Sequence, residues 1–508
     1  MESACRRRRR VGPHHNSRHQ RVDVDASDSD PVPENSKDVE SGGGRPEDMT
    51  LPAALALRAT TDPEGVFLIF EDQTVTFGQL ETRAEALAAS LHGLGIELGD
   101  RVAVVMPSWP EFVISMFAIA KLGAVLVPLN PKLTADDLRY TLRHSEAVAA
   151  ITAETLGDID FLQLFEELLV QLPELQYLVT VGEEDLWYDD RVFQFEDLLS
   201  AGGGRDYSST PPSADEVLAI LYTAGTTGKP KGVELTHANL LQVAGSTADV
   251  LGLGRDDRVV GVMALFHVFG LGPGILGSLL SGATLVLQDE FGSAGSLDLV
   301  ERHQATVHYG VPTLFVAELR EQSRAPRDLT SLRCGLVAGA PVSDDLVKAV
   351  QANLFPEVLI AYSLTETSST VCITRLDDPG AKRIFTVGRP LENNVLKILD
   401  PDGVELPVES VGEISVRGPG VMRGYYRQPR ETSSLVAGEG YFLTGDLGME
   451  DEEGFIHLVG RKKEVIIRSG SNVYPREVED RLQSHPGIRE SMVAGVSDEL
   501  LGEAIYAC

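Results

Sequence analysis

The sequence predicts an α/β protein. We expect a large N-terminal domain of two doubly wound parallel sheets and a small β-barrel, followed by a small, incomplete α+β C-terminal domain. From Val66 onward, short apolar runs alternate with helical segments, which is typical of parallel strands buried on both faces. After Pro390 the runs are shorter and separated by turn signals, which favours antiparallel structure. The 508 residues also exceed what one hydrophobic core usually organises.

The first domain begins with a strand and a helix. Residues 66–70 (VFLIF) predict the strand, and a Thr76–Gln79 capping box opens a helix with apolar residues at helical spacing. The alternation resumes at Val217 and lasts to about residue 363. The predicted strands after the first are residues 101–106, 124–129, 217–222, 259–265, 283–288, 306–311, 332–339 and 358–363. A third region begins near Gly460, with the run EVIIRSG and a helix over 476–482.

The chain is expected to divide into three parts. Residues 1–48 combine an arginine run, histidines, SDSD and three glycines, so they predict a disordered tail with almost nothing to bury. Met49 directly precedes the first patterned segment, and we expect the true start there; a basic nucleic-acid arm is the alternative. Residues 49–461 then form the large domain and residues 462–508 the small one.

Charge and composition exclude several classes of protein. The net charge is −32, and only nine lysines follow residue 48, so the surface should repel nucleic acid. We interpret this as adaptation to molar salt; an ordinary acidic enzyme is the alternative. The longest apolar stretch, residues 112–129, is interrupted by Lys121 and Gly123, short of the roughly 20 residues of a membrane span.

The expected compartment is the cytoplasm. The five arginines at 6–10 are followed by polar residues, not by the apolar core of a signal peptide. The four cysteines lie far apart, so neither a disulfide framework nor a zinc site is encoded.

A glycine-rich loop is the strongest motif. In LYTAGTTGKPKG, residues 221–232, a buried strand runs into a loop of small and hydroxyl residues that can wrap phosphates. Thr226 and Thr227 offer hydroxyl groups, and Lys229 and Lys231 offer positive charge. It is not a Walker loop, because Thr223 replaces the first glycine and the residue after Lys229 is proline.

From these residues, the sequence resembles the acyl-adenylate-forming superfamily of acyl-CoA synthetases, adenylation domains and luciferases. The resemblance extends over about Leu51 to Cys508. Besides the phosphate loop it rests on three motifs in the family's order: AYSLTET at 361–367, GYFLTGD at 440–446 and GRKKEVIIRSGSNVYPREVE at 460–479.

The resemblance implies a nucleotide site. Tyr362 would pack on adenine, the Thr365 hydroxyl would meet the α-phosphate, and Glu366 would hold Mg²⁺, for which a carboxylate oxygen is suited. Asp446 would accept hydrogen bonds from both ribose hydroxyls, and Arg461 would meet the ribose and phosphate region. The full set expected to bind nucleotide or CoA is Thr223, Gly225, Thr226, Thr227, Gly228, Lys229, Gly339, Ala340, Pro341, Tyr362, Thr365, Asp446, Arg461, Lys463 and Gly470.

The resemblance also implies two half-reactions on one site. Lys463 falls on the hinge about which the small domain rotates, and Gly470 on the loop that lines the pantetheine tunnel. Gly339 to Pro341 would lie along the adenine and the acyl pocket. ATP, Mg²⁺ and CoA are then required, and Thr226, Lys229, His267, Thr365 and Glu366 are the catalytic candidates.

The acid is indicated mainly by VMALFHVFGLG, residues 262–272. In fatty-acyl and aryl CoA ligases the position of His267 flanks the carboxylate, and its apolar neighbours here favour a medium- or long-chain fatty acid, or else an aryl acid. A satisfied core histidine is the alternative for His267. The literal GxGxxG at Gly272 to Gly277, with Asp289 downstream, is not preceded directly by a strand, so helix packing explains it better than a dinucleotide site.

One expected feature is missing. The family carries a lysine in a PxxxxGK-like context beyond the point where this sequence stops, at LGEAIYAC. We therefore expect a truncated acyl-CoA ligase; the rival is a non-catalytic adenylate-binding protein. The expected partners are the acid, ATP and CoA, without nucleic acid or an integral membrane segment, and a homodimer is left open.

Overall fold

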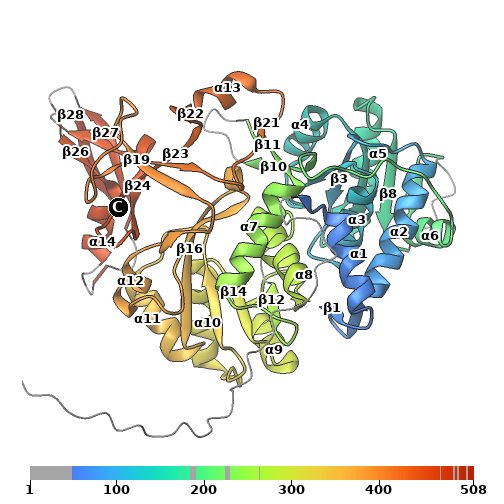
Figure 1. Cartoon of the computed structure of the whole chain (residues 1–508), viewed down its shortest axis with the longest axis horizontal. Coiled ribbons are helices and arrows are strands. Elements are labelled where there is room, and N and C mark those ends of the chain that lie inside the picture. The colour runs from blue at the N-terminus through green and yellow to red at the C-terminus, as the bar shows by residue number, and fades with distance from the viewer. Residues whose placement is uncertain are drawn as a thin grey trace, which may run out of the picture. The chain divides into compact units, whose positions relative to one another are not determined.

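The computed structural model describes residues 48–183, 190–223, 229–261, 264–468, 471–483, 485, 487–488, 491–498 and 501–508. Two large mixed sheets organise the described part up to residue 390, and smaller antiparallel sheets follow (Figure 1). The predicted tail, except Asp48, lies outside the described residues. The helices are α1 (Leu51–Thr61), α2 (Phe77–Gly93), α3 (Pro110–Lys121), α4 (Ala135–Ser145), α5 (Phe161–Gln171), α6 (Phe195–Gly202), α7 (His237–Val250), α8 (Gly277–Ser281), α9 (Ser293–His303), α10 (Pro312–Arg324), α11 (Asp344–Asn353), α12 (Gly380–Phe385), α13 (Pro429–Ser434) and α14 (Pro475–Gln483).

The first large sheet has nine strands in the order β18-β17-β16-β15-β14-β12-β13-β1-β2. The strands from β16 to β1 are parallel, whereas β17, β18 and β2 are antiparallel edges. β2 and β17 each follow the preceding strand after a turn of a few residues, which is too short for the crossover that a parallel neighbour requires. The strands are β1 (Val66–Phe70), β2 (Gln73–Thr76), β12 (Arg258–Gly261), β13 (Thr284–Leu287), β14 (Val307–Gly310), β15 (Cys334–Val337), β16 (Glu357–Leu364), β17 (Ser369–Ile373) and β18 (Arg389–Pro390).

The second large sheet has eight strands in the order β21-β11-β10-β4-β3-β5-β8-β9. Only β11 and β21 are antiparallel to their neighbours. The strands are β3 (Arg101–Val105), β4 (Val125–Pro128), β5 (Ala147–Ala153), β8 (Tyr177–Val181), β9 (Val192–Gln194), β10 (Val217–Thr223), β11 (Lys231–Thr236) and β21 (Gly424–Tyr425). A short hairpin, β6 (Thr155–Leu156) and β7 (Ile159–Asp160), lies outside both large sheets.

Burial on both faces explains the continuous apolar strands of this second sheet. Successive side chains of a strand point to opposite faces. In β3, Val102 and Val104 join the main hydrophobic core, while Ala103 and Val105 join a second core formed with α4 and α5. The predicted doubly wound arrangement is confirmed, and the capping box at Thr76 and Gln79 opens α2 as expected.

The glycines at 272–277 belong to a buried helical segment, η2 (Gly270–Leu276), that continues into α8. It packs against α7, and a Cβ on Gly277 would lie 3.7 Å from the carbonyl oxygen of Ala244 on that helix. Asp289 accepts a hydrogen bond from Trp109 Nε1 at 2.7 Å. These contacts agree with the helix-packing interpretation of the GxGxxG pattern. β12 contains residues 259–261 of the strand predicted over 259–265; residues 262 and 263 lie outside the described residues, and residues 264 and 265 are not in a strand.

The antiparallel region predicted after Pro390 contains a five-stranded sheet. Its order is β19-β20-β23-β22, and β24 pairs with the other end of β23. A four-stranded sheet follows in the order β26-β25-β28-β27, beside α14. The strands are β19 (Val395–Leu399), β20 (Gly412–Arg417), β22 (Val436–Ala437), β23 (Tyr441–Glu450), β24 (Ile456–Arg461), β25 (Ile466–Arg468), β26 (Ser471–Val473), β27 (Val493–Asp498) and β28 (Gly502–Ala507).

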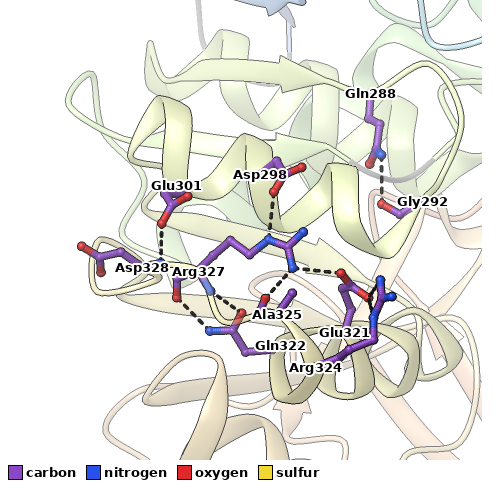
Figure 2. A network of polar contacts seen from close by, with 10 residues as sticks. All are labelled: Gln288, Gly292, Asp298, Glu301, Glu321, Gln322, Arg324, Ala325, Arg327 and Asp328. Carbon is purple, nitrogen blue, oxygen red and sulfur yellow. Dashed lines mark hydrogen bonds and ion pairs between the residues drawn. The ribbon is translucent and has the colours of Figure 1, made fainter.

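A polar network fixes the connection between α10 and β15 (Figure 2). Arg327 lies at its centre and forms ion pairs with Asp298 at 2.8 Å and with Glu321 at 2.9 Å. Glu321 also accepts from Arg324, and the hydrogen bonds from the two arginines lower the pKa of its carboxyl group. The network thereby ties α9 and α10 to the segment that enters β15.

No helix of the described part is both long and apolar enough to cross a lipid bilayer.

A buried histidine joins the start of α1 to α7. His237 is 1% exposed, and its Nδ1 accepts a hydrogen bond from the Leu51 backbone N–H at 3.1 Å. Burial lowers the pKa of His237 from 6.5 to about 4. Between pH 6.5 and 4, the unfolded chain therefore binds a proton at His237 that the folded chain does not bind. The contribution of the neutral His237 to the free energy of unfolding is intact above pH 6.5 and declines toward pH 4.

We predict that His237→Asn reduces the loss of stability on acidification. Between pH 7.5 and 5.0 the wild-type free energy of unfolding should fall by roughly 2 kcal/mol more than that of the variant, because one pKa unit corresponds to about 1.4 kcal/mol. Urea unfolding at the two pH values measures this difference. His485→Gln, at an exposed histidine, is the control and should follow the wild type. Equal pH dependence of His237→Asn and wild type would contradict the buried neutral histidine.

Candidate active site

The candidate site is built around a tight turn at the end of β16. The segment η3 (Thr365–Thr367) is followed by Ser368 and Ser369, whose φ angles are 58° and 99°. The Ser368 hydroxyl donates to the carbonyl oxygen of Gly420 at 2.9 Å. A Cβ on Gly420 would lie 2.6 Å from the Thr367 carbonyl oxygen, so this close approach requires glycine. The turn is therefore held by the 420 segment, which lies far away in sequence.

The buried Tyr362 and the half-buried Asp446 form a pair beside this turn. Tyr362 is 6% exposed in β16, and its hydroxyl donates to Asp446 Oδ2 in β23 at 2.7 Å. Burial raises the pKa of Tyr362 well above its ordinary range, so the hydroxyl stays protonated. Burial also raises the pKa of Asp446, although the hydrogen bond from Tyr362 acts in the opposite direction.

Arg461 completes this group from the neighbouring strand. Asp446 and Arg461 are directly paired across β23 and β24, and Arg461 Nε lies 3.6 Å from Asp446 Oδ1. The Arg461 side chain is 59% exposed, whereas that of Asp446 is 15% exposed. The arrangement presents an anchored carboxylate next to a cation that a ligand in solution can reach.

Glu366 and Lys231 both contact one tyrosine, Tyr425. The Tyr425 hydroxyl donates to Glu366 Oε1 at 2.8 Å, and Lys231 Nζ lies 4.7 Å from the centre of the Tyr425 ring. The pairing of β11 with β21 brings these groups together, since Val233 lies opposite Tyr425. The exit of the glycine-rich loop is thus fixed beside the turn that carries Glu366.

The two lysines of the glycine-rich segment have aromatic neighbours. Lys229 Nζ lies 5.3 Å from the centre of the Tyr140 ring. Neither Lys229 nor Lys231 forms an ion pair within the described residues, whereas Lys121, Lys382 and Lys462 each lie within 2.8 Å of a carboxylate. A cation on an aromatic face keeps its full charge, so these two lysines are available to an anionic ligand.

Part of the predicted phosphate loop lies outside the described residues. Thr223 ends β10 and lies opposite Lys231. Gly225, Thr226, Thr227 and Gly228 lie outside the described residues, as does Gly470.

His267 lies at the surface just before η2. Its side chain is accessible, so it is not the satisfied core histidine of the alternative interpretation. Its Nδ1 accepts from the Phe269 backbone N–H at 3.3 Å, which leaves the proton of the neutral imidazole on Nε2. The surrounding protein displaces water and lowers the pKa of His267. A Cβ on Gly272 would lie 3.5 Å from the Ser368 carbonyl oxygen, so the helical segment that follows His267 approaches the turn.

The remaining predicted residues lie on connections. Gly339, with φ of 82°, Ala340 and Pro341 are exposed directly after β15. Lys463 is exposed in η4 (Lys462–Glu464), between β24 and β25. Within the described part, neither His267 nor Lys463 makes a hydrogen bond or ion pair with the Tyr362 or Glu366 groups.

Sequence reasoning missed two contributors. Tyr425 donates a hydrogen bond to Glu366, and its ring lies beside Lys231. Glu413 accepts hydrogen bonds from Lys462 Nζ at 2.6 Å and from the Gly445 backbone N–H at 3.1 Å. The hydrogen bonds of Glu413 join β20 to the segment before Asp446 and to η4. Neither residue stands in the three motifs, and only the pairing of distant strands gives them these contacts.

The donor set around Glu366 fits Mg²⁺ that arrives with phosphates. The described residues contain no group of three or more histidine, cysteine, aspartate or glutamate side chains arranged for a metal. Glu366 offers one carboxylate, half-buried, whose Oε2 is free of the Tyr425 hydrogen bond. Mg²⁺ is usually held by one or two carboxylates together with substrate phosphates and water, not by an all-protein cage.

We predict that Tyr362→Phe lowers the free energy of unfolding by about 1–2 kcal/mol, because the half-buried Asp446 carboxylate loses a hydrogen-bond donor. Urea unfolding at pH 7.5 measures the change. Tyr441→Phe is the matched control, a buried tyrosine on β23, the strand that carries Asp446; its described contacts are those of its ring with Lys397 and Arg417. An unchanged stability of Tyr362→Phe would mean that this hydrogen bond does not anchor Asp446.

Comparison with known proteins agrees with this geometry. A family model described as AMP-binding enzyme matches residues 55–426. The long-chain-fatty-acid–CoA ligase of Bacillus subtilis is 31% identical, with 90% of this chain and 85% of that protein covered. The mitochondrial medium-chain acyl-CoA ligase ACSF2 of Mus musculus is 30% identical, with 88% and 76% covered.

Solved structures are similar over the same extent. The anthranilate CoA ligase AuaEII in complex with anthranoyl-AMP has a TM-score of 0.83 at 26% identity, with 91% of this chain and 87% of that chain covered. The o-succinylbenzoate CoA synthetase MenE of Bacillus subtilis, in complex with ATP and magnesium ion, has a TM-score of 0.75 at 30% identity, with 89% and 88% covered. Together with the family match, these similarities establish that the chain belongs to the AMP-binding enzyme family.

Proposed function

We propose that this chain is an ATP- and Mg²⁺-dependent acid–thiol ligase that converts a carboxylic acid to acyl-AMP and then to acyl-CoA. The proposal depends on one observation: two groups of polar side chains lie together at the end of β16. One is the anchored Tyr362–Asp446 pair with Arg461, and the other is Glu366 with Lys231. Ligands of open α/β sheets bind at such carboxyl ends of strands.

The proposed roles follow from the side-chain chemistry. The half-buried Asp446 carboxylate has Oδ1 available to accept hydrogen bonds from ribose hydroxyls, and Tyr362 offers a ring face to adenine. Lys229 and Lys231 have no carboxylate partner in the described part, so their charge is available to phosphates. Thr365 begins the turn and offers a hydroxyl group to the α-phosphate.

In the first half-reaction, an oxygen of the acid carboxylate forms a bond to the α-phosphorus of ATP, and the bond to pyrophosphate breaks. Glu366 would hold Mg²⁺, which supplies charge neutralisation for the departing pyrophosphate. Lys229 and Lys231 add fixed positive charge, and the turn at 365–369 fixes the Thr365 and Glu366 side chains before the substrate binds. The residues thus position charge and form no covalent intermediate with the protein.

In the second half-reaction, the CoA sulfur attacks the acyl carbonyl carbon and AMP leaves. We propose that residues 462–508 act as a small domain that turns about Lys463 relative to residues 49–461, and that the Gly470 loop then guides the thiol. Support comes from the exposure of Lys463 in the short connection between β24 and β25. Lys462 forms an ion pair with Glu413, and such a rotation would break this contact.

For the acid we propose a medium- or long-chain fatty acid. Support comes from His267, which has an Nε2 proton to donate to a carboxylate and lies next to the apolar Phe266, Val268 and Phe269. An aryl acid is the second candidate, favoured by the similarity to a ligase that holds anthranoyl-AMP.

The proposal is tested by thermal unfolding in molar KCl with non-hydrolysable acyl-adenylate analogues that carry acetyl, octanoyl, palmitoyl or cinnamoyl groups. A ligand at about 100 times its dissociation constant should stabilise the protein by roughly 2.7 kcal/mol. We expect the octanoyl or palmitoyl analogue to give the largest rise in melting temperature.

The control variants are alanine substitutions at Lys229, Thr365, Glu366 and Asp446, which should weaken ATP binding. A cinnamoyl preference would favour the aryl acid. Unchanged ATP binding in all four variants, or no shift with any analogue in a chain that melts cooperatively, would contradict the ligase proposal.

A further inference from the structure

We propose that Tyr425 is a positioning residue, which orients the Glu366 carboxylate for Mg²⁺-bound nucleotide and couples it to Lys231. The inference rests on the proposed function, because it assumes that Glu366 meets the metal of Mg-ATP. Tyr425 is 7% exposed and lies in β21, a two-residue strand at the edge of the second large sheet. It stands outside the motifs that indicated the site.

The segment before and including Tyr425 holds both the backbone and the side chain of Glu366. The Met422 backbone N–H donates to the Glu366 carbonyl oxygen at 2.8 Å, and the Tyr425 hydroxyl donates to Glu366 Oε1 at 2.8 Å. With Oε1 held in this way, the carboxylate has a fixed orientation, and Oε2 is left for a cation.

The ring of Tyr425 contacts Lys231. Lys231 Nζ lies 4.7 Å from the ring centre, at the start of the strand that leaves the glycine-rich segment. A hydroxyl that donates to a carboxylate increases the electron density of its ring, which strengthens the attraction of a cation to the ring face. Tyr425 thereby links one group proposed for phosphate to the group proposed for the metal.

The position of Tyr425 does not depend on its hydroxyl. Its backbone N–H donates to Thr432 Oγ1 at 2.9 Å, and β21 pairs with β11 through the backbone. Removal of the hydroxyl oxygen alone should therefore leave the ring beneath Lys231 and change only the support of Glu366. This separates a positioning role from a packing role.

The test compares Tyr425→Phe with Tyr426→Phe. Tyr426 is the adjacent tyrosine, and its hydroxyl lies 3.5 Å from Glu146 and not near Glu366. Calorimetric titration with ATP is performed in excess Mg²⁺ and, separately, in EDTA. We expect Tyr425→Phe to raise the dissociation constant for Mg-ATP roughly 10-fold, as is typical for loss of a group that supports a metal ligand. The constant in EDTA should change less than about 2-fold, and Tyr426→Phe should match the wild type in both arms.

A double variant decides whether Tyr425 acts through Glu366. Glu366→Gln should remove the gain in affinity that Mg²⁺ gives, and addition of Tyr425→Phe to it should have no further effect on Mg-ATP binding. An Mg-ATP constant for Tyr425→Phe equal to that of the wild type, or an equal weakening with Mg²⁺ and with EDTA, would overturn the positioning role. Failure of Glu366→Gln to alter the Mg²⁺ effect would instead overturn the proposed function of Glu366.

Discussion

The turn of residues 365–369 is the constraint on which the candidate site depends. Two consecutive serines with positive φ reverse the chain between β16 and β17, a backbone conformation that costs free energy and that the surrounding structure must hold. The 420–425 segment supplies the restraint through Ser368, the Glu366 backbone and the Glu366 side chain. Because that same segment pairs with β11, the end of one large sheet is fixed to the glycine-rich segment of the other. The site is therefore a junction between two sheets.

The arrangement of charge follows from the same junction. In a chain with net charge −32, most described lysines lie beside carboxylates, and such pairs neutralise their charge locally. Lys229 and Lys231 instead rest on tyrosine rings. An acidic protein can bind a polyphosphate in this way, because a small number of its lysines form no ion pair with its own carboxylates and can pair with phosphate. The Asp446 carboxylate, held by the buried Tyr362, adds a fixed acceptor near the turn.

Much of this fold could be predicted from local pattern. The strands β1, β3, β4, β10 and β12 to β16 and the capped helix after Thr76 were expected, because burial on both faces and capping leave clear local signals. The strands β5, β8 and β9 of the second large sheet were not predicted. The antiparallel edges β11, β17 and β21 were not expected, since short edge strands have weak patterns and pair with distant partners. Through the resemblance, the motifs assigned Tyr362, Glu366 and Asp446 to one nucleotide site, and in the structure Tyr362 contacts Asp446 while Glu366 lies in the turn after β16. Tyr425 and Glu413 were missed, because their importance arises from tertiary contacts and not from residue type.

In the proposed adenylate site, the turn after β16 carries the metal ligand Glu366 and lies near Asp446, the ribose ligand on β23. A crystal structure with ATP and Mn²⁺ in place of Mg²⁺, with the metal located by anomalous scattering, tests this arrangement. We expect an anomalous peak at about 2.0–2.2 Å from a carboxylate oxygen of Glu366, next to the phosphates, with the ribose hydroxyls on Asp446. A fully occupied nucleotide whose metal lies away from Glu366, or whose ribose lies away from Asp446, would contradict it.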